Sequence, residues 1–150
     1  MTQRDTETRP LRLLIAFDSI QRGGAEEYAL SLARGIALRG VEVHATFPAA
    51  PGTATLAGDF RQAGIAVHPG NFGRTAAVCG RRPRPLPKII EYLSMRRVLR
   101  TVQPDVAHIS LAGQAAAQGI RAACASMRIP ATAILHVRPR DPIAPSRTRR

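Results

Sequence analysis

The sequence is poor in the residues that mark several classes of protein. Only two of its 150 residues, Cys79 and Cys124, are cysteines, and tryptophan is absent. Two cysteines are too few for a disulfide scaffold, so we expect free thiols and a reducing compartment. No run of about 18 apolar residues occurs, and residues 1–10 have no apolar stretch. We therefore expect neither a membrane span nor a secretion signal, and a cytoplasmic protein.

Acidic side chains are also scarce. The chain has 10 Asp and Glu against 22 Lys and Arg, for a formal net charge of +12. Such an excess of positive charge favours an anionic partner. The candidates are a phosphorylated small molecule, an anionic membrane face and nucleic acid. Aromatic residues make up only 4% of the chain, whereas single-strand binders stack bases on aromatic rings, so nucleic acid ranks last. The four histidines lack metal-site spacing, and we expect no metal.

Short apolar runs alternate with helical patterns along the chain. Strands are predicted at residues 11–17, 41–47, 65–68, 105–110 and 131–137, and helices at 25–38, 53–63, 87–102 and 112–127. This alternation predicts an α/β fold, with a doubly wound parallel sheet of Rossmann type. In such folds ligands bind at the carboxyl ends of the strands.

The composition predicts one domain with a short segment on either side of it. Residues 1–10 are predicted to be a flexible lead, and residues 11–137 the domain. Residues 138–150 contain three prolines and five arginines and are predicted to be a disordered tail. Residues 70–87 are rich in Gly, Pro and Arg, which predicts a long loop.

Gly23 and Gly24 follow the first predicted strand and open the next helix. A helix N-terminus presents unpaired N–H groups and the positive end of its dipole, which suits phosphate. The pair could also serve only as a tight corner between strand and helix. Its spacing fits neither the G-x-G-x-x-G fingerprint nor a P-loop. Glu26 and Glu27 are predicted to cap the helix.

The stretch RGGAEEYALSLARGIALRGVEV, followed by PDVAHIS and ILHV, resembles the N-terminal domain of GT-B glycosyltransferases of family 4. The resemblance covers roughly residues 11–137. It implies the N-terminal half of a retaining hexosyltransferase, which moves a sugar from a nucleotide-sugar to a hydroxyl of a sugar or lipid-linked acceptor without a cofactor.

The family's donor-binding domain has no counterpart in these 150 residues. We therefore expect a truncated chain that is inactive alone, or one half of a split enzyme with a separate donor-binding domain. The alternative is a non-catalytic module that binds an anion or a membrane surface.

The resemblance also implies roles for single residues. Gly23 and Gly24 match the glycine loop that meets the donor phosphates or the acceptor. His136 matches the histidine that faces the reacting sugar and is predicted to be catalytic, and His108 is predicted to bind substrate. The competing interpretation is that both histidines are structural, at strand ends.

One predicted helix, residues 87–102, is strongly basic on one side. At 100 degrees per residue, Arg96, Arg97 and Arg100 gather opposite its apolar residues. This pattern is typical of a helix that packs on a sheet with its arginines in solvent. It also fits a helix that lies on an anionic membrane, here at the inner face.

Overall fold

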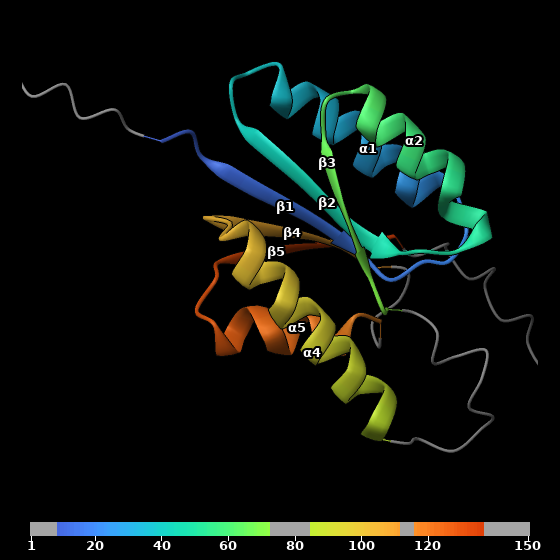
Figure 1. The fold of residues 1–150 in the computed structure, drawn as a ribbon, viewed down its shortest axis with the longest axis vertical. Helices are drawn as coiled ribbons and strands as arrows, with labels where there is room; N and C mark the ends of the chain where they lie inside the picture. The colour runs from blue at the N-terminus through green and yellow to red at the C-terminus, as the bar shows by residue number, and fades with distance from the viewer. Residues whose placement is uncertain (1–8, 73–84, 112–115, 137–150) are drawn as a thin grey trace, which may run out of the picture.

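The computed structural model describes residues 9–72, 85–111 and 116–136. Five strands form one parallel sheet in the order β3-β2-β1-β4-β5. Helices cover both faces of this sheet (Figure 1). In chain order the elements are β1 (Arg12–Phe17), α1 (Gly24–Ala37), β2 (Glu42–Pro48), the 3-10 turn η1 (Pro51–Thr53), α2 (Ala54–Gln62), β3 (Ala66–Gly70), α4 (Pro85–Val102), β4 (Val106–Leu111), α5 (Gln118–Ser126) and β5 (Ala131–Leu135).

The three central strands, β1, β2 and β4, are buried because their successive residues face two separate cores, whereas the edge strand β5 is mostly exposed. On one face, Leu13, Ile15 and Phe17 of β1 pack against α1 and α2. On the other face, Leu14 and Ala16 pack against α4 and α5. A strand buried on both sides needs a continuous apolar run rather than an alternating one. The predicted doubly wound α/β fold is therefore confirmed.

The order of the strands changes direction at β1. From β1 the chain passes outward to β2 and β3, and it then returns to place β4 on the other side of β1. Helices α1 and α4 therefore start at the same edge of the sheet, where the strands end (Figure 1). In doubly wound folds this switch point is where ligands bind.

The last predicted helix starts later than its alanine-rich sequence indicates. Residues 112–127 were expected to be helical, but residues 116 and 117 form a turn and α5 begins at Gln118. Ala117 has a left-handed backbone with φ of 54°, and its N–H donates to Asp18 Oδ2 at 2.9 Å. The contact with the end of β1 holds this residue outside the helix. Residues 112–115 lie outside the described part of the chain.

Several other predictions lie outside the described ranges. These are the lead up to residue 8, most of the predicted loop (residues 73–84), Cys79, and the tail with the last predicted strand residue (137–150). Helix α4 begins at Pro85, two residues before its predicted start. No helix in the described part of the chain has the length and apolar character needed to cross a bilayer.

Candidate functional site

The two predicted histidines lie near each other on one face of the sheet, but only His136 is at the end of a strand, because His108 is the third of the six residues of β4. In the parallel register His108 of β4 is opposite Ile15 of β1 and Thr132 of β5. His136 directly follows β5, and its N–H donates to the carbonyl of Leu111 at 2.9 Å. Since alternate residues of a strand face the same side, both imidazoles project toward the α1 face.

Tyr28 of α1 joins these two histidines into one cluster. Its ring centroid lies 5.4 Å from that of His136 and 6.4 Å from that of His108, with tilted planes. Thr132 Oγ1 lies 3.1 Å from His108 Nδ1, within hydrogen-bond distance. We call these residues and Ser110 the histidine cluster. It brings together β4, β5 and α1, three elements that meet at the switch point.

Three polar atoms of the histidine cluster are buried and have no hydrogen-bond partner among the described residues. They are His108 Nε2, His136 Nε2 and Ser110 Oγ. His108 is 8% exposed and Ser110 only 2%. Buried polar atoms are nearly always paired, and an unpaired one costs free energy, so such atoms call for an explanation. Imidazole nitrogens and a hydroxyl are well suited to hydrogen-bond the hydroxyls of a sugar.

Burial makes His108 a neutral group at physiological pH. The surrounding protein lowers the pKa of its imidazole below the usual 6.5, and the charge of His136 lowers it further. The neutral ring has one nitrogen that donates and one that accepts a hydrogen bond. With Nδ1 near Thr132, Nε2 is the nitrogen left for another partner.

The predicted glycine corner lies at the same edge of the sheet, at the start of α1. Gly23 is the N-cap of the helix, and no side-chain hydrogen bond caps this end. Its φ of −155° is extended backbone, so this corner does not require the conformational freedom of glycine. A Cβ added at Gly24 would meet nothing within 4 Å, and one at Gly23 would meet only Glu26 Oε2, at 3.2 Å. Open space therefore lies beside Gly24, whereas the carboxylate of Glu26 lies beside Gly23. The first amides of α1 have no partners within the helix.

The two glutamates of the first turn do not cap this helix with their side chains, contrary to the prediction. Glu27 instead pairs with Arg22, whose Nη1 also lies 2.7 Å from Asp59 Oδ2 of α2. Glu26 is buried, with an exposed fraction of 6%. The side chain of Arg22 therefore fixes the loop before α1 to α2 and already has two carboxylate partners.

The other histidines form a separate group at the opposite edge strand. His44 Nδ1 lies 3.1 Å from His68 Nε2, and His44 Nε2 lies 3.0 Å from Glu42 Oε1. Glu42 in turn accepts a hydrogen bond from Arg12 at 2.8 Å. These contacts give His44 and His68 partners between β2 and β3, which is typical of structural histidines.

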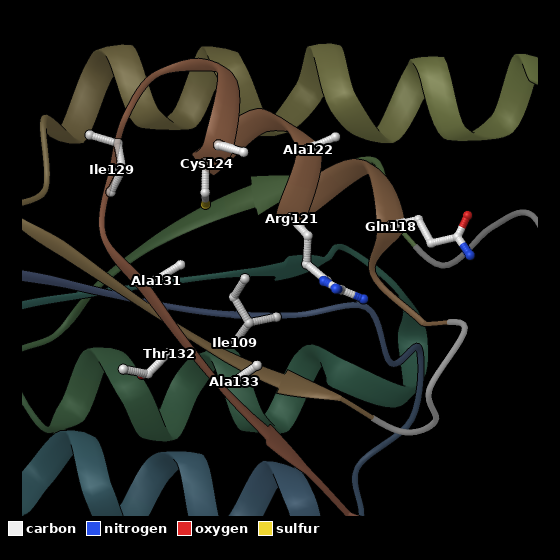
Figure 2. A pocket seen from close by; sticks show the side chains of 10 residues that line it. Ile109, Gln118, Arg121, Ala122, Cys124, Ile129, Ala131, Thr132 and Ala133 are labelled. Atoms are coloured by element: carbon white, nitrogen blue, oxygen red, sulfur yellow. The ribbon is translucent and has the colours of Figure 1, made fainter.

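A second feature of the described surface is a hollow of about 740 Å³ beside β5. Figure 2 shows α5 and the turn after it on one side of the hollow, with β4 and β5 on the other. The hollow is lined by Ile109 and so lies on the α5 face of the sheet, opposite the face of His108, although Thr132 of the edge strand β5 borders both. Cys124, which also lines it, is a free thiol whose pKa burial raises to about 11. The hollow lacks an activated nucleophile.

Sequence reasoning missed three members of the histidine cluster. Tyr28 lies one helical turn after Gly24. The helical periodicity of the sequence places it on a partly exposed side of the helix but does not show what it contacts. Thr132 contacts His108 because β4 and β5 pair in parallel with these residues opposite. Ser110 follows His108 by two residues and shares its face. The alternation along β4 could have indicated Ser110, whereas the other two depend on the tertiary structure.

Comparisons with known proteins agree with this architecture. A glycosyltransferase from Rickettsia africae ESF-5 matches 84% of this chain with 30% of its own, at TM-score 0.60 and 12% identity. MurG of Acinetobacter baumannii matches 84% with 34% of its chain, at TM-score 0.62 and 16% identity. The UDP-GlcNAc 2-epimerase of Neisseria meningitidis, solved with UDP-GlcNAc bound, matches 83% with 32% of its chain, at TM-score 0.56 and 13% identity.

Structural similarity at these identities shows a shared fold. The chain spans about a third of the length of these three neighbours. No curated protein matches the sequence. The family model described as Glycosyltransferase Family 4, in contrast, matches residues 22–150, which include the glycine corner and every member of the histidine cluster. The chain therefore belongs to Glycosyltransferase Family 4.

Proposed function

We propose that this chain forms the acceptor-side half of a nucleotide-sugar-dependent hexosyltransferase that retains the configuration of the sugar. The observation that carries the proposal is the histidine cluster, which presents two buried, unpartnered imidazole nitrogens at the switch point of the sheet. Membership of Glycosyltransferase Family 4 supports sugar transfer as the reaction. The acceptor is a sugar or a lipid-linked sugar, and no cofactor takes part.

His136 is the residue that we place against the reacting sugar. Its Nε2 hydrogen-bonds a hydroxyl of that sugar and fixes the ring. His108 holds a second hydroxyl through Nε2, with Nδ1 held near Thr132. In the reaction the bond between the sugar carbon and the diphosphate oxygen breaks. The acceptor oxygen then bonds to that carbon and its proton is released.

Gly23 and Gly24 act on the leaving group. Negative charge builds on the nucleoside diphosphate as the sugar departs, and the amides at the start of α1 stabilise it. The absence of a side chain at Gly24 leaves room for this approach. Arg22 takes no part because Glu27 and Asp59 already hold it.

Complete activity further requires a donor-binding domain. The glycosyltransferase neighbours are about three times as long as the region they share with this chain. We propose that residues 1–150 bind the acceptor and contact the diphosphate, and that the donor-binding domain supplies most of the nucleotide contacts. Without it we expect the chain to be inactive.

The test is sugar transfer by the purified chain, alone and mixed with a donor-binding domain of the same family. We expect turnover only in the mixture, and a loss of about 100-fold or more for His136→Ala, which removes a group that acts on the reacting sugar. His68→Gln, a change of histidine at the far edge of the sheet, should retain turnover. Equal activity of the two variants would refute the role of His136, and a folded chain without turnover in any mixture would indicate a binding module.

A substitution at Gly24 tests the phosphate contact separately. Aspartate fits because a Cβ there meets nothing within 4 Å, and a negative charge in the first turn favours the helix. Gly24→Asp should therefore fold normally but oppose the diphosphate, whereas Gly24→Asn has nearly the same size without the charge. We expect the aspartate variant to lose turnover much more than the asparagine variant. Equal losses would show that size alone matters at this position.

A further inference from the structure

The loop between β1 and α1, residues 18–23, packs closely against the turn η1. A Cβ added at Gly52 of η1 would lie 2.6 Å from the backbone carbonyl oxygen of Ile20 and 3.2 Å from Gln21 Cα. The φ of Gly52 is not in the positive range, so its own backbone conformation does not require glycine. The close approach of the loop is therefore what requires glycine at this position.

An ion pair joins the same loop to α2. Arg22 Nη1 lies 2.7 Å from Asp59 Oδ2, and α2 lies beside α1 on one face of the sheet (Figure 1). Within the loop, the hydroxyl of Ser19 donates to the carbonyl of Gln21 at 2.7 Å. The chain is therefore held on η1 and α2 at the residues immediately before the glycine corner.

The turn η1 is itself fixed to the end of the central strand β2. Thr53 is only 1% exposed, and its hydroxyl donates to the carbonyl of Pro48 at 2.7 Å and accepts from the N–H of Ala50 at 3.2 Å. Pro48 is the last residue of β2. A buried hydroxyl with partners on both sides resists displacement, because moving the turn would leave these polar groups unpaired. The sheet thus supports η1, and η1 supports the loop.

We propose that Gly52 and Asp59 are positioning residues, which set the place of the glycine corner relative to the diphosphate of the substrate. Both act through the loop before α1 rather than on the substrate. Their role in transfer rests on the proposed function, in which the amides at the start of α1 stabilise the leaving group. That stabilisation depends on donors fixed at the right distance from the developing charge, so a displaced corner lowers the rate of transfer.

The size of the displacement follows from the contact at Gly52. An ordinary contact between a Cβ and this carbonyl oxygen is 3.4 Å or longer, so Gly52→Ala requires a shift of about 0.8 Å. Because Thr53 anchors η1, we expect the loop and the glycine corner to move. A misplacement of about 1 Å can cost about 100-fold in rate, and we expect a loss of about tenfold. Gly58→Ala in α2 is the matched control, since a Cβ there would meet nothing within 4 Å.

The first measurement is NMR of the isotope-labelled full chain without ligand, with circular dichroism to verify folding. Gly52→Ala should move the amide resonances of Gly23 and Gly24, and Gly58→Ala should leave them in place. Asp59→Asn removes the charge that holds Arg22 and should move the same resonances, which tests the proposal if Gly52→Ala does not fold. Resonances of the glycine corner that stay in place in the folded variants would overturn the proposal.

The second measurement is single-turnover sugar transfer by the chain mixed with a donor-binding domain of the same family. Gly52→Ala should lower the rate about tenfold when residue 24 is glycine and much less when it is aspartate, because both changes act on the same corner. A general loss of folded protein would lower the rate by the same factor in both backgrounds, and that outcome would overturn the proposal.

The two measurements also separate a failure of the positioning role from a failure of the proposed function. Absence of turnover in the wild-type mixture, together with resonances that move as expected in the free chain, would refute sugar transfer and not the support of the corner by η1. Normal turnover of Gly52→Ala in the mixture would refute the positioning role alone.

Discussion

Among the glycines in the described residues, we expect Gly119 to be the one whose replacement by alanine disturbs the packing of α4 against α5. A Cβ at this position would lie 2.7 Å from the Lys88 carbonyl oxygen, 2.7 Å from the Tyr92 backbone nitrogen and 2.8 Å from Glu91 Cβ. Two of these atoms belong to the backbone of α4 and cannot move away as a side chain would. The two helices must therefore separate to admit one methyl group.

The size of the effect follows from the cost of overpacking. Forcing a methyl group into a packed interface typically costs about 1–3 kcal/mol, and backbone contacts below 3 Å place Gly119→Ala at about 2 kcal/mol or more. Gly35→Ala is the matched control, since its Cβ would meet nothing within 4 Å. Alanine in the interior of α1 should stabilise the protein by about 0.8 kcal/mol.

Thermal and urea unfolding, followed by circular dichroism, would measure both variants. A change of 1 kcal/mol shifts Tm by about 4 °C for a domain of this size. We expect Gly119→Ala to lower Tm by about 8 °C and Gly35→Ala to raise it by about 3 °C. If the two variants unfolded at the same temperature, the close approach of α4 and α5 at Gly119 would be refuted.

Three further predictions concern buried titratable groups. The pKa of His108 is lowered, so the stability that depends on its neutral form is complete above about pH 6.5 and is lost as the pH falls below that value. His108→Gln should therefore flatten the pH dependence of the unfolding free energy between about pH 7 and 5, and an unchanged slope would contradict this. Burial raises the pKa of Glu91, so the cost of ionising its carboxyl in the folded protein grows as the pH rises above 4.5. Glu91→Gln should therefore match or exceed the wild-type Tm at neutral pH. A lower Tm would show that the charge of Glu91 is needed for its contact with α5. The Cys124 thiol should react with a thiol reagent only as fast as the protein unfolds, because it is buried and its pKa is about 11; rapid labelling of that residue, identified by mass spectrometry, would show otherwise.

The sequence predicted the strands well because each is short and bounded by clear breaks. Leu11 to Phe17 is an almost continuous apolar run, interrupted only by Arg12, and β1 covers all but its first residue. The start of α5 was wrong because Ala117 is fixed by Asp18, about 100 residues away in the chain. A local propensity contains no information about such a contact.

The candidate site, like the fold, could be predicted only in part from the sequence. His108 and His136 could be selected from the resemblance to the family, and the structure brings both to one side of the sheet. The prediction that His108 follows a strand was wrong, because β4 continues to Leu111. Tyr28 and Thr132 could not, since their contacts depend on how α1 lies on β4 and on the pairing of β4 with β5.

The measurement that tests the central claim most directly is a titration with UDP-glucose of the isotope-labelled chain, mixed with an unlabelled donor-binding domain of the same family and followed by NMR. The account predicts saturable shifts at the amides of Gly23 and Gly24 and at the ring of His136, where diphosphate and sugar would lie. It predicts no such shifts around Arg121 at the hollow beside β5 (Figure 2) or at Arg97 on α4. Saturable shifts at either of those places, with none at the glycine corner and the histidine cluster, would contradict the placement of the site.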